Sequence, residues 1–337
     1  MYDHFIKDLL VIGSGSAGRR HALALRELFP NATISVIKRS NSLQPTELLA
    51  QKDINIVNGF KNIEGASYDV VVIASPATLH YDDTLRMIEN SSFLLIEKPV
   101  TADLTSATKI QSILENSKKK LRVAYHLRFS ETVVKLKQLV ESGAYGKLAS
   151  ANFNYSQNLP LWRPLIDERQ SVSARKELGG GVLLELSHEI EAVQYLMGEI
   201  NSVSNVSLSN DGANTDGEVE TSATFAGKIK DGANFNIHLD MITTPPIRNW
   251  SLKFESAQVG ANLLSGEIQI SEDGEDFFKI HESKPFERDR AELSMLRSFL
   301  DLPNFNKIDL CKIGEATNVM KVIDAVKDTH KCTTKLI

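Results

Sequence analysis

The chain has 337 residues, is 42% hydrophobic and carries a formal net charge of −5 at pH 7. That length is typical of about two domains, and that composition supplies enough apolar side chains for buried cores. The mild negative charge excludes a protein-wide field for nucleic acid, and no segment approaches the roughly 18 apolar residues of a membrane helix, so we expect neither partner.

The first third of the chain alternates apolar runs with helical patterns. Helices are expected up to about Phe29, from about His80, and over 101–117. Near-continuous Val, Ile and Leu in strands that lie between helices is typical of a parallel sheet covered on both faces. The fold class is therefore α/β, and we expect residues 1–123 to form a doubly wound Rossmann domain. Its strands are expected at 8–13, 32–37, 54–58, 68–76, 92–99 and 121–129.

After residue 123 the pattern changes. A long strand is expected over 145–158, and beyond residue 200 the apolar period becomes two. Asp231-Gly232 and Asp273-Gly274 are hairpin signals, so these strands indicate an open, mainly antiparallel sheet with one buried face. The other face is polar and turns to solvent or a partner; it carries Glu220, Ser222, Thr224, Asn234, Asn236, His238 and Asp240.

Three helical patterns complete the second domain, at 130–142, 287–301 and 314–328. We expect residues 124–337 to form one α+β domain, whose C-terminal helix is a candidate to pack back on the first domain.

The two cysteines, Cys311 and Cys332, belong to no CxxC or Cys/His cluster, which argues against a zinc site or a disulfide framework. The N-terminal apolar run is too short for a signal peptide. We expect no metal and a reducing, cytoplasmic location.

A glycine motif follows the first expected strand and opens a helix. Gly13, Gly15 and Gly18 form G-x-G-x-x-G. The first glycine permits a tight turn, the second lets backbone approach a pyrophosphate, and the third lets the helix pack close to the strand. The helix N-terminus supplies N–H groups to the phosphates, so we expect a dinucleotide here. The loop is completed by Ser14, Ser16 and Ala17.

The end of the second strand distinguishes NAD from NADP. A site for NAD carries an acidic residue there, about 20 residues after the motif, to bind the ribose 2′-hydroxyl. This chain has Lys38, Arg39 and Ser40 instead. Two cations and a hydroxyl suit a 2′-phosphate, which favours NADP over NAD. The alternative is a solvated basic loop.

Polar residues also follow the fourth and fifth strands. Ser75, Pro76 and His80 follow the fourth, and Glu97 with Lys98 ends the fifth. In open α/β sheets ligands bind beyond the carboxyl ends of the strands. A lysine that ends a buried strand is costly unless it is paired, so either the acid before it satisfies it or it has a lowered pKa beside substrate and nicotinamide. For His80 the alternative is a helix-start residue without a role.

The stretch "GGGVLLELSHEIEAV", 179–193, predicts a helix after three glycines. One side of this helix is an apolar stripe, and Glu185 and His188 lie on the other side with Glu189 and Ala192. By itself that second side would be a solvated face. With a dinucleotide motif and a strand-end lysine in the same chain, we expect it to line a cleft between the domains. The glycines would let backbone pass close to cofactor or substrate.

Motifs that recur in order carry a family resemblance: G-x-G-x-x-G-x-x-H to His21, Ser-Pro with His80, Glu-Lys-Pro at 97–99, "LRF" at 127–129, and the glycine-rich helix start. The chain resembles the glucose–fructose oxidoreductase, inositol dehydrogenase and MocA (Gfo/Idh/MocA) family over essentially its whole length. That resemblance implies an NAD(P)-dependent oxidoreductase acting on sugars, cyclitols or polyols. It also implies a second domain that often forms the oligomer interface, hence a homodimer or homotetramer.

The resemblance assigns residues to roles. It places the family's lysine, which helps catalysis and substrate positioning, at Lys98, with a cis bond to Pro99, and it places Glu97 at the nicotinamide end of the cofactor. The family's later motif is an Asp followed by a His four residues on. Here Glu185 precedes His188 by three, which leaves the role of the acid open. His126 and Arg128, in the last part of the sixth expected strand, are expected on the substrate side.

The segment before the glycines also looks like a branch of the family associated with surface-polysaccharide and acidic-sugar pathways. It is dense in cations, with Trp162 as a surface on which a sugar or base stacks, and these suit an anionic sugar. The alternative is a surface loop whose arginines pair with Asp167, Glu168 and Glu177, and the sequence favours neither interpretation over the other. The cations are Arg163, Arg169, Arg175 and Lys176.

Together these features predict reversible hydride transfer between NADP(H), or NAD(H), and a carbinol carbon of a sugar derivative. His188 is expected to be the general acid/base, because its charge changes near neutral pH. Lys98 would hydrogen-bond the reacting oxygen, Glu185 would orient His188 or bind a hydroxyl, and the Lys and His roles are exchangeable. The alternative is a non-catalytic dinucleotide-binding sensor with the same fold, which the altered acid–His spacing favours.

Overall fold

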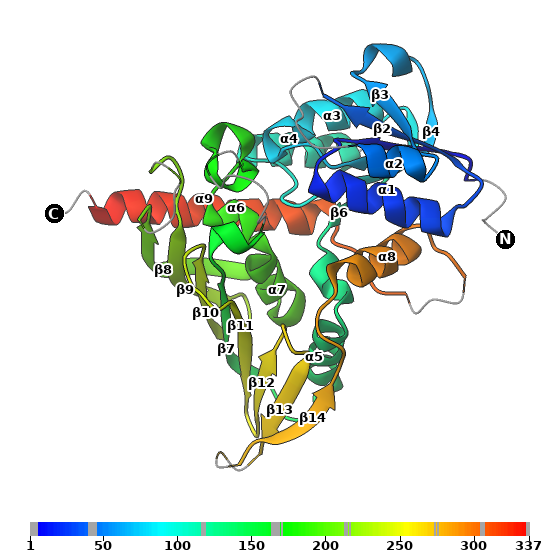
Figure 1. The fold of residues 1–337 in the computed structure, drawn as a ribbon. Coiled ribbons are helices and arrows are strands. Elements are labelled where there is room, and N and C mark those ends of the chain that lie inside the picture. Colours follow the sequence, from blue (N-terminus) through cyan, green and yellow to red (C-terminus); the bar gives the residue numbers. More distant parts are fainter. Residues whose placement is uncertain are drawn as a thin grey trace. The chain divides into compact units, whose positions relative to one another are not determined.

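A computed structural model describes residues 6–39, 46–115, 119–162, 169, 171–211, 215, 217–272, 274, 276–303 and 307–334. The chain divides into two compact units (Figure 1). The first consists of Met1–Phe129 with Arg288–Thr317, and the second of Ser130–Glu287 with Asn318–Ile337. This division differs from the single boundary expected after residue 123, because a late segment returns to the first unit.

The first unit contains a six-stranded parallel sheet with the strand order β3-β2-β1-β4-β5-β6. All six expected strands are present, and the doubly wound order is confirmed. The sheet is the core of this unit, since the whole of Leu9–Ile12 and Val70–Ile73 is buried. Its strands are β1 (Asp8–Ile12), β2 (Thr33–Lys38), β3 (Asn55–Asn58), β4 (Tyr68–Ile73), β5 (Ser91–Glu97) and β6 (Lys120–Ala124).

The sixth strand is shorter than expected. It ends at Ala124, and His126–Phe129 form the 3₁₀ helix η3, because the Arg128 N–H bonds the Tyr125 carbonyl and turns the chain. The prediction of strand over 126–129 is therefore wrong. The prediction rested on the apolar residues of "HLRF", which are buried as expected, but in a 3₁₀ helix and not in a strand.

The helices of the first unit include one that was assigned to the second domain. α8 (Arg288–Phe299) contacts α1 and η3, and a bridge pairs Val123 with Cys311. These long-range contacts return 288–317 to the nucleotide-type fold. The other helical elements are α1 (Ser16–Leu28), α2 (Glu47–Gln51), η1 (Lys61–Ile63), η2 (Ala77–Leu79), α3 (His80–Met87) and α4 (Leu104–Glu115).

The second unit contains an eight-stranded sheet with the order β14-β13-β12-β11-β7-β10-β9-β8. Only the pairing of β7 with β10 is parallel, so the mainly antiparallel sheet is confirmed. The hairpin at Asp231-Gly232 joins β9 to β10, whereas Asp273 lies outside the described residues. The strands are β7 (Leu148–Ser156), β8 (Ile200–Ser209), β9 (Ser222–Ile229), β10 (Asn234–Asp240), β11 (Ile247–Phe254), β12 (Gln258–Asn262), β13 (Glu267–Ser271) and β14 (Phe278–Glu282).

Helices cover one face of this sheet (Figure 1). α6 (Val182–Glu185) contacts β9 and β10, and α7 (Ser187–Met197) contacts β7, β10 and α5 (Glu131–Ser142). Phe153 and Trp250 are buried on the sheet, with ring centroids 5.0 Å apart. The last helix, α9 (Ile313–Thr334), belongs to the first unit up to Thr317 and to the second beyond it. No helix within the described ranges has the length and apolarity needed to cross a membrane.

The opposite face carries polar side chains, and some of them bond to one another across strands. Glu220 departs from the expected position, because it precedes β9 and its carboxylate lies 3.5 Å from Lys327 of α9. Asn236 donates to Asn152 at 2.9 Å, and Thr224 Oγ1 lies 2.8 Å from His238 Nδ1. Asp240 departs from the expected exposure because it is only 3% exposed. Its carboxylate accepts the N–H groups of Ile242 and Thr243, which fixes the turn after β10.

Candidate functional site

Two glycines of the motif between β1 and α1 are required by the protein's own packing. Gly13 has φ +111°, and a Cβ there would lie 2.5 Å from the Ala74 carbonyl oxygen. A Cβ on Gly18 would lie 1.8 Å from the Gly13 carbonyl oxygen, so α1 lies against the loop that precedes it. Neither position accepts a larger residue without moving backbone.

Gly15 differs because the described residues give no steric reason for a glycine at this position. A Cβ there would meet no atom of the described residues within 4 Å, and its φ of −68° suits any residue. Gly15 is the N-cap of α1, whose first turn has no acidic residue and no side-chain cap. Uncapped N–H groups, the helix dipole and open space at a glycine together fit a pyrophosphate. Around this loop Ser14 is buried, Ser16 exposed and Ala17 half-buried.

The cation expected to bind a 2′-phosphate is already engaged. Arg39 Nη2 lies 2.6 and 2.7 Å from the two carboxylate oxygens of Asp83 on α3. Ser75, after β4, donates its hydroxyl to the same carboxylate at 2.6 Å. Lys38 ends β2 and is half-buried, and Ser40 lies outside the described residues.

His80, expected to bind cofactor, has both ring nitrogens directed at backbone. Nε2 lies 2.8 Å from the Ser75 carbonyl oxygen and Nδ1 lies 3.0 Å from that of Pro99. Burial lowers the pKa of this imidazole, and a neutral ring donates to only one of the two acceptors. His80 thus ties the loop after β4, which includes Pro76, to the loop after β5.

The strand-end motif forms a tightly bonded turn. Glu97 Oε1 lies 2.7 Å from Nε2 of His21 on α1, and Glu97 Oε2 accepts the Lys98 N–H at 3.0 Å. The Lys98–Pro99 bond is cis, as the resemblance implied. Lys98 itself is half-buried at the carboxyl end of the sheet. Both carboxylate oxygens of Glu97 are therefore engaged in hydrogen bonds within the protein.

Neighbouring charges and hydrogen bonds shift the pKa values of Glu97 and His21 against the effect of burial. Burial opposes ionisation of Glu97, but the hydrogen bond and charge of His21 hold its pKa well below the usual range. Burial would lower the pKa of His21, yet the bond to Glu97 and the charge of Glu292 outweigh it and raise that pKa. Glu292 on α8 accepts both of its bonds from Arg20, at 3.0 and 3.1 Å, while burial raises its own pKa.

The two residues expected on the substrate side after β6 are buried in the first unit. Burial, and then the charge of Arg288, lowers the pKa of His126 well below its usual value. Arg128 donates to the Asp309 carbonyl at 3.1 Å and lies 3.5 Å from Glu315. Arg128 therefore anchors the returning segment.

In the second unit the expected single helix is two. α6 ends at Glu185 and α7 begins at Ser187, because Leu186 leaves helical geometry with φ −102° and ψ 24°. Glu185 is half-buried and His188, in the first turn of α7, is 6% exposed. A solvated face is excluded, since Glu189 is 0% exposed.

A buried ion pair holds α7 on the sheet. The guanidinium of Arg248, on β11, contacts Glu189 Oε1 with Nε and Nη2, each at 2.7 Å. Arg248 Cζ also lies 4.3 Å from the centroid of the Tyr155 ring. Glu189 follows His188 directly, so this pair fixes the first turn of the helix that carries the histidine.

The three glycines before α6 are explained by the protein itself. Gly179 has φ +83°, and a Cβ on Gly180 would lie 2.6 Å from the carbonyl oxygens of Val172 and Ser173. Gly181 has φ +111°, and its Cβ would lie 2.7 Å from the Glu220 carboxylate. The close approach expected for a ligand is thus made by the chain's own backbone and by Glu220.

The basic segment is described only in part, since Arg163, Asp167 and Glu168 lie outside the described residues. It includes the 3₁₀ helices η4 (Leu159–Trp162), η6 (Val172–Ala174) and η7 (Lys176–Leu178). Trp162 Nε1 donates to the Gln157 carbonyl at 3.1 Å. Arg175 Nε donates to Glu177 at 2.6 Å, one of the pairings of the alternative reading; Arg169, Arg175 and Lys176 are exposed.

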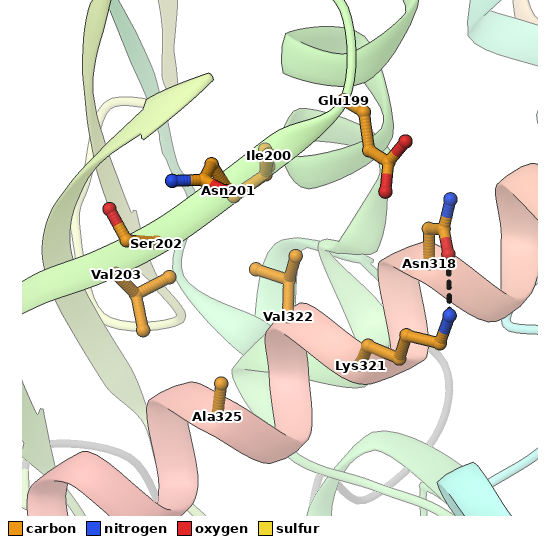
Figure 2. A pocket seen from close by; sticks show the side chains of 9 residues that line it. All are labelled: Glu199, Ile200, Asn201, Ser202, Val203, Asn318, Lys321, Val322 and Ala325. Atoms are coloured by element: carbon orange, nitrogen blue, oxygen red, sulfur yellow. Dashed lines mark hydrogen bonds between the residues drawn. The ribbon is translucent and has the colours of Figure 1, made fainter. Parts of the chain in front are cut away.

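A depression of about 230 Å³ lies between β8 and α9 in the second unit (Figure 2). It is lined by Glu199, Asn201, Lys321 and Val322, among others, and Lys321 bonds Asn318 at 3.0 Å. It contains none of the expected site residues. Within the described ranges, no group of three or more His, Cys, Asp and Glu side chains is placed to hold a metal ion.

Two family models match the chain. Residues 7–125 match an oxidoreductase family with an NAD-binding Rossmann fold, and residues 133–255 match the GFO/IDH/MocA C-terminal domain. The chain belongs to the Gfo/Idh/MocA oxidoreductase family. Both halves of the sequence resemblance are thereby confirmed.

Relatives in the Gfo/Idh/MocA family are distant. The inositol 2-dehydrogenase of Rhodococcus jostii is 25% identical over 195 residues, 57% of this chain and 50% of that protein. The glucose-6-phosphate 3-dehydrogenase of Bacillus subtilis is 26% identical over 204 residues, 57% of this chain and 54% of that protein. The match thus spans about half the length of these curated relatives. A levoglucosan dehydrogenase in complex with NADH shares the fold, with a TM-score of 0.83, 17% identity, and 96% and 97% of the two chains covered.

Several residues of this Gfo/Idh/MocA member had no signal in the motifs. Asp83 and Arg248 lie far in sequence from the residues they bond, and Glu292 is on a helix assigned to the other domain. For Asp83 the sequence offers one weak indication. It lies three residues after His80 in "HYDD", in the first turn of the helix that follows the fourth strand, and therefore on the same side of that helix as His80.

Proposed function

We propose that this chain is an NAD(P)-dependent oxidoreductase that transfers hydride between nicotinamide and a carbinol carbon of a sugar or sugar derivative. The observation that carries the proposal is Gly15: no described residue would meet a Cβ there, whereas a pyrophosphate at the uncapped start of α1 needs the close approach of a glycine. The names of the relatives, inositol 2-dehydrogenase and glucose-6-phosphate 3-dehydrogenase, support the oxidation of a ring hydroxyl.

When bound, the nicotinamide accepts or delivers the hydride, and the chain supplies positioning and proton transfer. Lys98, at the end of β5, donates a hydrogen bond to the reacting oxygen and stabilises negative charge on it. His188 takes the hydroxyl proton on oxidation and returns it on reduction, or exchanges that role with Lys98. Glu185 orients His188 or binds a neighbouring hydroxyl.

Glu97 supports this scheme by holding the turn that carries the lysine. Its carboxylate accepts the Lys98 N–H with one oxygen and bonds His21 of α1 with the other, so the turn is tied to that helix. A fixed turn limits the freedom of the Lys98 side chain relative to the sheet, which is what positioning a reacting oxygen requires.

For the cofactor we propose NADP in preference to NAD, on the basis of the cations at the end of β2 and the lack of an acid there. The substrate proposed is a small sugar carrying an anionic group, for which Trp162, Arg163, Arg175 and His126 are candidate contacts. A phosphorylated sugar fits this class, and the name of the Bacillus subtilis relative supports it. A homodimer or homotetramer is the proposed assembly.

The test is nicotinamide absorbance with a panel of neutral, phosphorylated and carboxylated sugars. Lys98→Ala and His188→Ala are each expected to reduce kcat at least about a hundredfold, the usual contribution of a positioned acid or base. Lys61→Ala, which removes an exposed lysine of the same unit, is the matched control and should keep wild-type turnover. Near wild-type turnover in both test variants would exclude the scheme.

A second candidate is a non-catalytic dinucleotide-binding sensor. The observation that favours it is the shortened acid–histidine spacing, with the helix interrupted at Leu186 between Glu185 and His188. The two candidates separate on one measurement. A sensor binds NADPH or NADH in a fluorescence titration but turns over no sugar in the panel, whereas the enzyme does both.

A further inference from the structure

Two cations lie at the end of β2, Lys38 and Arg39, and they differ in their ion pairs. The Arg39 guanidinium contacts both oxygens of Asp83, at 2.6 and 2.7 Å, whereas no ion pair of Lys38 is seen within the described ranges. A cation that already faces a carboxylate attracts a further anion much less than an isolated cation does.

The Asp83 carboxylate is held in place rather than free to move away. Its side chain is 1% exposed on α3, and the Ser75 hydroxyl donates to it at 2.6 Å from the loop after β4. Because it is buried, it is shielded little by solvent or salt. An incoming phosphate would therefore meet the Arg39–Asp83 pair and not the guanidinium alone.

Arg39 is fixed from a second side. Its Cζ lies 5.2 Å from the centroid of the Phe60 ring, and Arg86 Cζ lies 5.1 Å from the same centroid. The Arg39 side chain is nevertheless 35% exposed, so it remains accessible to a ligand at the end of β2. The guanidinium is thus accessible, oriented and neutralised at once.

We propose that Asp83 sets the balance between the two cofactors: as a built-in anion on Arg39 it weakens the hold on a 2′-phosphate, so the protein accepts NADH as well as NADPH. The inference rests on the proposed function, since it assumes that the loop at Gly15 binds a dinucleotide. Asp83 does not touch the cofactor in this scheme. It acts through Arg39 and is a specificity-determining residue that lies on a different strand–helix unit from the motif.

The test compares dissociation constants of NADPH and NADH, measured by nicotinamide fluorescence on the full chain. Asp83→Asn keeps hydrogen-bonding atoms for Arg39 and Ser75 but removes the charge. It should tighten NADPH binding about five- to tenfold and change NADH binding by less than about twofold. The same comparison with 2′,5′-ADP and 5′-AMP isolates the 2′-phosphate.

Asp82→Asn is the matched control, because it removes the same charge from the neighbouring, exposed residue of the same helix turn. It should shift neither cofactor by more than about twofold. If Asp83→Asn fails to fold as judged by thermal unfolding, Asp83→Ser removes the same charge with a smaller side chain and carries the same expectation.

Unchanged or weaker NADPH binding in the Asp83 variants overturns the proposal, as does an equal gain for both cofactors or an equal effect of Asp82→Asn. Failure of the proposed function looks different: wild-type protein then binds neither NADPH nor NADH, which overturns both. Wild-type binding of NADH with no response of NADPH to Asp83→Asn overturns only the role of Asp83.

Discussion

Arg248→Met should destabilise the second unit more than any surface substitution. The change removes two contacts of 2.7 Å to Glu189 and the stacking on Tyr155. The side chains of Arg248 and Glu189 are 6% and 0% exposed, so water does not replace the lost partner. Breaking a buried pair on one side costs about 3–5 kcal/mol, because the remaining carboxylate stays buried without this counter-charge.

The double variant distinguishes this cause from simple loss of packing. Glu189→Gln combined with Arg248→Met removes both charges, and it should recover at least about half of the loss caused by Arg248→Met. A packing defect alone would persist in the double variant, since methionine occupies the position in both proteins.

The assay is urea unfolding followed by tryptophan fluorescence. Both tryptophans, Trp162 and Trp250, belong to the second unit, and Trp250 is fully buried two residues from Arg248. Lys230→Met is the control: it breaks a 2.6 Å pair with Glu199 in the same unit, but both partners are exposed, so it should cost less than about 1 kcal/mol. A loss for Arg248→Met no larger than that of the control would refute the reasoning.

Three further results are expected. Gly15→Ala should unfold like the wild type yet lose NADPH and NADH binding in fluorescence titrations, whereas Gly18→Ala should lower the melting temperature as well, because its Cβ has no room. In the wild type, the raised pKa of His21 means that its stabilisation is complete below pH 6.5 and is lost as pH rises through the pKa of the folded state. His21→Gln should therefore show a smaller decrease in the free energy of unfolding as pH rises above 6.5, measured by urea unfolding at several pH values. Gly181→Ala should cost about 1–3 kcal/mol in urea unfolding, because its φ of +111° and the Glu220 carboxylate both oppose a Cβ.

The strands and the cofactor loop could be predicted because their signals are local. Apolar runs such as Val70–Ile73 are continuous in sequence, and Gly18 is required by its contact with the Gly13 carbonyl within a single strand–turn–helix. The hairpin at Asp231-Gly232 is local in the same sense. Each of these features is decided by residues fewer than 20 positions apart.

What could not be predicted depends on contacts between distant segments. Asp83 engages Arg39 across 44 positions and Arg248 engages Glu189 across 59, so neither pair leaves a mark in the local pattern. The break at Leu186 also had no signal in the sequence, because leucine is a good helix former. Candidate residues were thus easier to name than their bonding partners.

The return of 288–317 to the first unit has a consequence for any attempt to divide the chain. A fragment that stops at Phe129 contains the whole parallel sheet, but it lacks Glu292, the carboxylate that bonds Arg20, and α8, which contacts α1. It also lacks Cys311, whose backbone pairs with Val123. The nucleotide-type half is therefore not encoded by one continuous stretch, and a domain exchange with a relative must carry two separate pieces of the gene to transfer it intact.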